Sequence, residues 1–301
     1  MMDRRRFIFD SVAGTLFLAC PGLFSACGSG KAIRFGVVTD VHYAQRENGV
    51  LRYGDSLDKL RAAVEYFNGC KLDFVIELGD FKDCVGRDKE GAMGYLSDVE
   101  AVLQTSKAPV YHVLGNHDMD LLSKEDFFSM AHNPAEVGNG SWYSFVKSGV
   151  RFIVLDSCFR PDGVPYNSGN YSWKESFVPS EELSWLKEEL SSSREPVVVF
   201  NHQMLDSFDT RIPVESFVTN ADEVRAALEQ SGKVLACIQG HWHDASYSES
   251  NGIHYYTQRA MLLGHLPEND SYSVVEIDKD LNFTISGLAD CESFDWNSRK
   301  L

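Results

Sequence analysis

Five short polar clusters in this chain carry side chains that can bind metal ions. They combine carboxylate, amide and imidazole groups, and each follows an apolar, β-branched run: Asp40–His42, Gly79–Asp83, Gly115–Asp118, Asn201–His202 and Gly240–His243. Mixed oxygen and nitrogen ligands of this kind suit transition-metal ions. Because the strands of a parallel sheet end at a common carboxyl edge, the five clusters are expected to meet there.

A pair of metal ions needs one carboxylate that can bind both ions and further ligands from several loops. Asp80 follows a strand and a glycine and is the expected bridge. Taken singly, each cluster is more often a turn or a satisfied core residue. Their number and their common place after strands favour a two-metal hydrolase of phosphoesters. The other expected ligands are Asp40 and His42 for one ion, Asn116 and His202 for the other, and His241 and His243, which can serve one ion each.

The composition fits a globular enzyme that acts on a small anionic substrate. With 301 residues, 44% hydrophobic content and five tryptophans, the chain can bury a sizeable core. Its net charge of -16 argues against a nucleic-acid polymer as partner, because proteins that bind such polymers cluster Lys and Arg against the phosphates. A small phosphorylated substrate would therefore depend on metal ions for binding.

The N-terminus has the pattern of a bacterial export signal. Three arginines precede an apolar stretch from Phe7 to Ala26, and because polar, proline and glycine residues interrupt that stretch, a membrane-spanning helix is the weaker alternative. Phe24–Cys27 resembles a lipobox, and Arg4-Arg5 resembles a twin-arginine signal. We expect residues 1–27 to direct export to the cell envelope, with a lipid on Cys27 as the only membrane anchor, and residues 28–301 to form the catalytic domain.

Apolar runs and helical periodicities alternate along the chain in a way that predicts an α/β protein. The first part has a β-α-β-α-β order, which predicts a largely parallel sheet with helices on its faces. A hairpin that starts at Trp142 opens a second sheet, and Asn220–Glu223 has the pattern of a helix capping box. The strands that lead into the five clusters are expected at Ile33–Thr39, Phe74–Leu78, Val110–Leu114, Val197–Phe200 and Val234–Ile238.

In this order, the five clusters resemble the signature of the calcineurin-like metallophosphoesterase superfamily, D-x-H, G-D-x-x-D, G-N-H-[DE], H and G-H-x-H. The resemblance runs from Asp40 to His243, about two-thirds of the chain. It implies a four-layer α-β-β-α sandwich of two mixed sheets with the metals at the carboxyl edges of the strands. It also implies two divalent ions, with manganese favoured and iron or zinc as alternatives.

The resemblance also implies a role for each matching residue. One ion would be held by Asp40, His42, Asp80 and His243, and the other by Asp80, Asn116, His202 and His241. His117 would stay free of metal and assist the leaving group, and Asp83, three residues after the bridging carboxylate, would hold it. Chemistry supports this division, because a histidine that is not a ligand can donate a proton to a departing oxygen.

Departures from subfamily patterns narrow the expected substrate. Cys84-Val85 follows Asp83 where Ser/Thr protein phosphatases have Arg-Gly, and purple acid phosphatases have Tyr in place of Asp83. Further motifs are Arg52–Leu57, Asn170–Trp173 followed by Glu182–Leu186, and Gly240–Asp244 with Ser250–Gly252. Through them the chain more closely resembles the manganese-dependent ADP-ribose/CDP-alcohol diphosphatases. Arg52 is able to grip a second phosphate, and Tyr171 or Trp173 to stack on a base. The alternatives are surface packing for these three residues and, for the protein, a cyclic-nucleotide phosphodiesterase, a phosphomonoesterase or an inactive metal-binding module.

Overall fold

The computed structural model describes residues 32–46, 49, 51–84, 86, 88–265 and 270–297. The predicted export signal and Cys27 lie outside these ranges. Within them, no helix is both long and apolar enough to cross a bilayer.

The first sheet has six strands in the order β12-β11-β10-β1-β2-β3. β1, β2 and β3 run parallel to one another, and β10, β11 and β12 add antiparallel strands on the other side of β1. The parallel strands are joined by helices because a parallel connection must cross back over the sheet. Its elements are β1 (Ile33–Val38), α1 (Ser56–Gly69), β2 (Phe74–Glu77), α2 (Lys89–Leu103), β3 (Val110–His112), β10 (Tyr272–Ile277), β11 (Phe283–Leu288) and β12 (Phe294–Trp296).

The second sheet also has six strands, in the order β4-β5-β6-β7-β9-β8. β4 and β5 form the predicted antiparallel hairpin, and β5, β6, β7 and β9 are parallel. Its elements are β4 (Tyr143–Lys147), β5 (Val150–Val154), α4 (Ser180–Ser192), β6 (Val197–Phe200), α5 (Ala221–Ser231), β7 (Val234–Gln239), β8 (Ser246–Ser250) and β9 (Ile253–Thr257). The chain between β3 and β4 forms the 3-10 turn η1 (His117–Met119) and the short helix α3 (Lys124–Phe128). A second 3-10 turn, η2 (Val214–Ser216), precedes α5.

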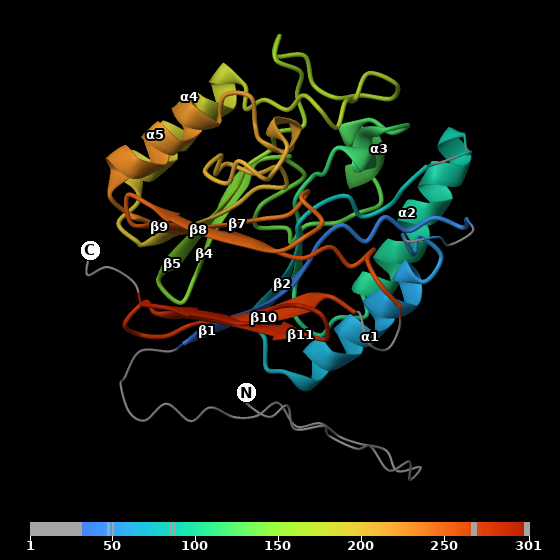
Figure 1. Ribbon diagram of the computed structural model, residues 1–301, viewed down its shortest axis with the longest axis horizontal. Helices are drawn as coiled ribbons and strands as arrows, with labels where there is room; N and C mark the ends of the chain where they lie inside the picture. The colour runs from blue at the N-terminus through green and yellow to red at the C-terminus, as the bar shows by residue number, and fades with distance from the viewer. Residues whose placement is uncertain are drawn as a thin grey trace, which may run out of the picture.

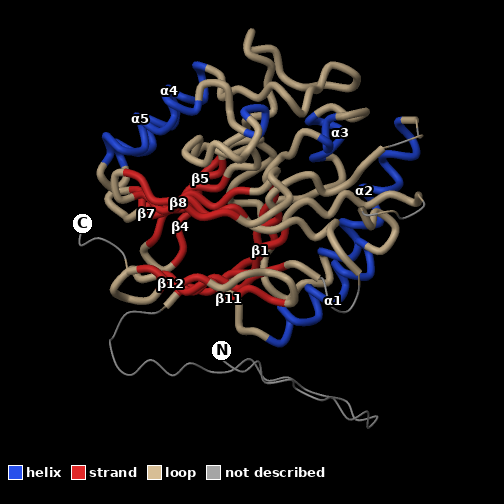
Figure 2. The backbone as a smooth tube through the Cα atoms, viewed as in Figure 1, coloured by secondary structure: helices blue, strands red, loops and turns tan. Residues whose placement is uncertain are grey.

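The two sheets and their helices form four layers, as the family resemblance implied. Figure 1 shows α1 and α2 over one sheet and α4 and α5 over the other, and Figure 2 shows the strands of both sheets between them. An aromatic cluster that includes Phe35, Phe74 and Phe152 fills the space between the sheets. Separate apolar clusters lie under each pair of helices. The predicted fold class is confirmed.

Helix α1 illustrates how the sequence selects these elements. Leu60, Val64 and Phe67 recur at helical spacing and all are buried against the sheet. Phe67 packs so closely on β1 that a Cβ atom at Gly36 would lie 2.9 Å from its ring. A side chain at that position of β1 would therefore require the Phe67 ring to move.

The predicted capping box at Asn220 is wrong. Asn220 does precede α5, but its side chain makes no hydrogen bond to the helix. It instead accepts from the backbone N–H of Val178, at 3.0 Å, and donates to the Val178 carbonyl, at 2.9 Å. A partner that is 42 residues away in the chain thus takes the side chain that the local pattern assigned to the helix end.

Candidate metal centre

The five clusters follow β1, β2, β3, β6 and β7 and converge at one edge of the two sheets. Backbone hydrogen bonds join the loops: Asp40 N–H donates to the Gly79 carbonyl at 3.0 Å, and Gly240 N–H donates to the His202 carbonyl at 3.0 Å. Gly79 permits this approach, since a Cβ atom there would lie 2.5 Å from the backbone nitrogen of Gly115 and its φ is 97°. The glycines in these clusters are thus needed for close packing of the loops.

Four of the predicted ligands have a left-handed backbone. Asp40, His42, Asp80 and His241 have φ values of 51°, 45°, 54° and 67°, and they are half of the eight non-glycine residues with positive φ in the described ranges. Such conformations cost of order 1–3 kcal/mol each for these residue types and are concentrated at functional sites. The fold thus holds these ligands in place against a local backbone cost.

Asp118, which was not among the predicted site residues, holds two of the loops together. Its buried carboxylate accepts from the backbone N–H groups of Asp80 at 3.0 Å, Phe81 at 2.9 Å and Gly115 at 2.9 Å. A carboxylate with several such donors is well satisfied without a metal. Its position as the fourth residue of Gly115–Asp118 was the signal that could have identified it.

Asp80 lies between two groups of candidate ligands. Its Oδ2 atom is 3.4 Å from His42 Nε2 and 3.2 Å from His202 Nε2. Burial opposes ionisation of this carboxyl, but His202 and His117 together hold its pKa well below the ordinary range. An ionised carboxylate therefore lies between imidazoles that come from two different loops.

The first group contains Asp40, His42 and His243. His243 Nε2 lies 3.5 Å from Asp40 Oδ1 and 3.2 Å from His42 Nε2. The other oxygen of Asp40 accepts from the Thr39 hydroxyl at 2.7 Å and from the His241 backbone N–H at 3.1 Å, while Oδ1 has no hydrogen-bond donor. One oxygen of Asp40 is thus held by the protein and the other faces two imidazoles.

The second group contains Asp80, His202 and His241. His202 Nδ1 donates to the Leu78 carbonyl at 2.7 Å, and Nε2 lies 3.2 Å from Asp80 Oδ2. Burial opposes protonation of this imidazole, but Asp80 raises its pKa to about 9, so a metal ion bound at Nε2 would displace a proton. Asn116 is also fully buried beside these residues, and its Oδ1 accepts from Gln203 at 3.2 Å. Burial and neighbouring His202 lower the pKa of His241 to about 3, so this imidazole is neutral.

The donor set fits two divalent ions. Buried Asp40 Oδ1 and His202 Nε2 have no hydrogen-bond partner among the described residues. The Nε2 atoms of His42 and His243 lie 3.2 Å apart, and both can act as acceptors. Polar atoms left in this way inside a protein are costly unless an ion binds them. Neutral imidazoles, carboxylates and an amide are suitable ligands for manganese, iron or zinc.

His117 lies beside these groups and lines an open cleft. Its backbone N–H donates to Asp80 Oδ1 at 2.7 Å, and its side chain is 24% exposed. Asp83 Oδ2 lies 3.7 Å from His117 Nδ1 and 3.6 Å from His42 Nδ1, so it lies near both rings. Burial lowers the pKa of His117, although Asp80 and Asp83 oppose that shift.

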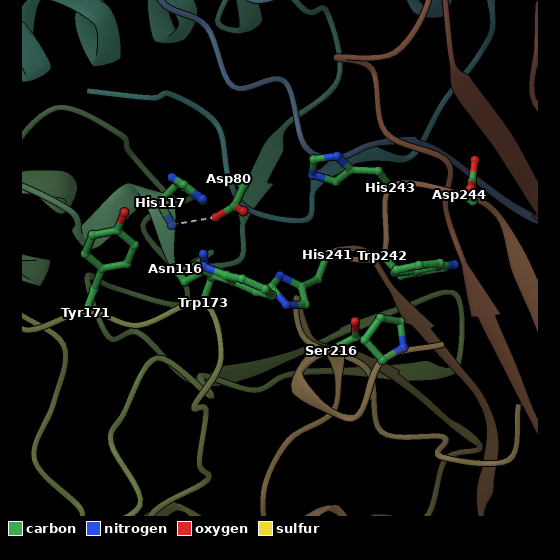
Figure 3. Close-up of a pocket in the computed structure, with 11 residues that line it drawn as sticks. Asp80, Asn116, His117, Tyr171, Trp173, Ser216, His241, Trp242, His243 and Asp244 are labelled. Carbon is green, nitrogen blue, oxygen red and sulfur yellow. Dashed lines mark hydrogen bonds between the residues drawn. The ribbon is translucent and has the colours of Figure 1, made fainter. Parts of the chain in front are cut away.

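The cleft above the centre has a volume of about 580 Å³. Figure 3 shows Asp80, Asn116, His117 and His241 facing it. Tyr171 and Trp173, the two candidate stacking residues, line it, and so does Trp242. Arg52 does not line the cleft: its guanidinium pairs with Asp55 at 2.5 Å.

Comparison with known proteins agrees with this geometry. The family model described as calcineurin-like phosphoesterase matches residues 33–245. This match spans most of the chain and decides which family it belongs to. The chain belongs to the calcineurin-like phosphoesterase family. It is a metal-dependent phosphoester hydrolase with a binuclear centre.

The individual relatives have low sequence identity to this chain. The chain is 27% identical over 285 residues to a manganese-dependent ADP-ribose/CDP-alcohol diphosphatase of Oryza sativa subsp. japonica, which covers 80% of this chain and 87% of the relative. The Homo sapiens protein of the same name is 24% identical, covering 83% and 88%. A dimetal phosphatase from Danio rerio has a TM-score of 0.73 at 22% identity, covering 88% of this chain and 98% of that one, so the two share a fold.

Proposed function

We propose that seven side chains of this phosphoesterase bind two divalent ions that share Asp80. The observation that carries the proposal is the position of Asp80 Oδ2, 3.4 Å from His42 Nε2 and 3.2 Å from His202 Nε2. Asp40, His42 and His243 would complete one ion site. Asn116, His202 and His241 would complete the other.

His117 is the proposed proton donor to the leaving group. When bound, two such ions activate water as a nucleophile and offset charge that develops on phosphorus. His117 faces the cleft, and its backbone is fixed by the hydrogen bond to Asp80. Burial lowers its pKa, but an anionic substrate beside it would favour the protonated imidazole. Asp83 would orient the ring from behind.

Manganese is the proposed physiological metal. The relatives from rice and human are named as manganese-dependent enzymes, and the donor set here has oxygen and nitrogen atoms in place of thiolates. Protein stripped with a chelator should lose activity and recover it fully with added manganese. Recovery with zinc or iron alone would reject this choice of metal.

The proposed substrates are nucleoside diphosphate derivatives of the ADP-ribose or CDP-alcohol type. This substrate class is taken from the names of the relatives. The cleft supports it with the aromatic side chains of Tyr171, Trp173 and Trp242, which can hold a base by stacking. No Lys or Arg lines the cleft in the described part of the chain, so the two metal ions, and not Arg52, would bind the diphosphate.

A substrate panel tests this class. With manganese, ADP-ribose and CDP-alcohols should have a higher kcat/KM than phosphomonoesters and cyclic nucleotides. Trp173→Ala should raise KM for the nucleotides and leave hydrolysis of a simple aryl phosphodiester unchanged, whereas Trp185→Ala, a change on α4, should alter neither. A clear preference for monoesters or cyclic nucleotides would overturn the diphosphatase assignment.

The acid role of His117 is tested with leaving groups of different basicity. Alkyl leaving groups need a proton more than nitrophenyl groups do. His117→Ala should therefore lose about 10² to 10⁴-fold on alkyl esters and much less on aryl esters, with both metals retained. Equal losses on the two kinds of ester would contradict the role.

We also propose that the enzyme is exported and anchored to the cell envelope by a lipid on Cys27, with residues 28–301 as the mature domain. The support is the sequence of the first 27 residues, with its arginines, apolar stretch and lipobox-like Phe24–Cys27. Cys27→Ser should release the protein from membranes or leave it unprocessed. A soluble chain that starts at Met1 in the wild type would reject this location.

A further inference from the structure

Lys82 is a buried lysine immediately behind the proposed acid. Its side chain is completely buried, although it lies in the loop that carries Asp80 and Asp83. Its ammonium forms an ion pair with Asp120, which is 3% exposed, and donates to the His117 carbonyl at 2.6 Å. A lysine is rarely buried to this extent without a defined set of partners, and here those partners belong to the segment that carries His117.

His117 is held at both ends of its own backbone by this one loop. Its N–H donates to Asp80 Oδ1 at 2.7 Å, and its carbonyl accepts from Lys82. The third contact is to its side chain, because Asp83 Oδ2 lies 3.7 Å from Nδ1. Residues 80, 82 and 83 therefore meet the amide, the carbonyl and the ring of a single residue. That arrangement fixes where the ring points.

Asp120 is part of the same device. Its Oδ1 atom accepts from Lys82 and from the Leu121 backbone N–H at 2.7 Å, and its own backbone N–H bonds to the His117 carbonyl at 3.4 Å. Cys84 lies close to Asp83 and Asp120, which gives this group the composition of a further metal site. The Lys82 ammonium already neutralises Asp120, so the group is better explained as an ion pair that sets the backbone.

We propose that the Lys82–Asp120 pair is a positioning device that holds His117 where it can protonate the leaving group. The inference rests on the proposed function of His117. Lys82 itself does not line the cleft, and its side chain is fully buried behind His117. Its effect on the reaction is exerted through the backbone of His117, and a small displacement of a reacting group can cost about 10²-fold in rate.

The test compares two esters and three variants of the full enzyme loaded with manganese. Lys82→Met should lose about 10²-fold in kcat on an alkyl phosphodiester and far less on a nitrophenyl phosphodiester, whose leaving group departs without a proton. Both metal equivalents should remain. The Lys82→Met/His117→Ala double variant should be no slower than His117→Ala, because removal of the ring makes its position irrelevant.

Lys59→Met is the matched control. Lys59 is equally buried and donates to the backbone carbonyls of Met261 at 2.8 Å, Leu263 at 2.6 Å and Gly264 at 2.9 Å. Its loss should lower the melting temperature without a difference between the two esters. If Lys82→Met does not fold, Asp120→Asn removes the charge that holds the ammonium and should show the same selectivity for the alkyl ester.

The outcomes separate this inference from the function on which it rests. If His117→Ala is selective for the alkyl ester and the Lys82 and Asp120 variants lose activity equally on both esters, the positioning role is overturned and the acid role stands. Loss of metal in Lys82→Met would also overturn the positioning role. If His117→Ala is itself unselective, both proposals fail.

Discussion

The protein contains two neighbouring clusters of buried histidines and carboxylates that differ in what their polar atoms face. In the first, which we call the Glu77 cluster, His112 lies between Glu77 and Glu100. Its Nδ1 is 3.2 Å from Glu77 Oε2, and its Nε2 is 3.3 Å from Glu100 Oε2. Burial opposes protonation, but the two glutamates raise the pKa of His112 to about 10. The imidazolium therefore supplies the positive charge that this cluster needs.

The second cluster is the metal centre, where imidazole nitrogens face one another as well as carboxylate oxygens. Nε2 of His42 and Nε2 of His243 lie 3.2 Å apart, which brings two acceptors together once both rings are neutral. Asp40 Oδ1 faces the same space with no donor. The same residue types thus form a complete ion cluster where nitrogen faces oxygen, and a metal site where lone pairs converge.

The substitution with the largest expected effect disrupts the metal centre and leaves the Glu77 cluster intact. Asp80→Ala should lose about two equivalents of metal and nearly all activity, because this carboxylate is proposed to bind both ions. His42→Ala and Asn116→Ala should each weaken one ion only. Elemental analysis of the purified variants measures both results, and a full metal content in Asp80→Ala would contradict the shared role.

The substitution with the next largest effect disrupts the Glu77 cluster and leaves metal binding unchanged. His112→Gln leaves two buried carboxylates without their cation, which should cost about 3–5 kcal/mol of unfolding free energy. Metal content and kcat of the folded enzyme should stay near the wild-type values. Urea denaturation at pH 7 measures the loss, with the exposed His132→Gln as control. A variant as stable as the wild type would show that the cluster is not an ion cluster.

The Glu77 cluster also predicts a pH dependence. The pKa of His112 is about 10 in the folded protein and about 6.5 when unfolded, so its contribution to stability is complete below about pH 6.5 and is lost as the pH rises through 10. The groups that face it are Glu77 on β2 and Glu100 on α2. The stability difference between wild type and His112→Gln should therefore shrink steadily between pH 7 and pH 10. A difference that stays constant over this range would contradict a charged His112.

Sequence alone predicted the elements whose signals are local. Val197–Phe200 is an unbroken β-branched and aromatic run, and the structure has β6 there, directly before Asn201-His202. The seven expected ligands also lie together, because each occupies the end of a strand and strand ends meet at one edge of a sheet. Such positions follow from chain order and need no knowledge of side-chain contacts.

Contacts between distant loops could not be predicted in this way. Lys82 reads as an ordinary surface lysine in sequence, and its partner His117 is 35 residues away. Arg52 was expected to bind a phosphate, yet it pairs with Asp55, three residues later, which is a spacing that the sequence does display. A sequence therefore gives weaker grounds for expecting an Arg or Lys to bind a ligand wherever an acidic residue lies three or four positions away.

The substitution with the smallest expected effect alters how one carboxylate of the metal centre is held. The Thr39 hydroxyl donates to Asp40 Oδ2 at 2.7 Å and thereby turns the free Oδ1 toward His42 and His243. Thr39→Val keeps the shape of the side chain and removes that donor. Because a lost partner of a metal ligand typically costs 10–100-fold in affinity, one manganese equivalent should bind about that much more weakly in a calorimetric titration. The second equivalent, held through His202 and its bond to Leu78, should be unchanged, and equal weakening of both would mean that the two ion sites are not held independently.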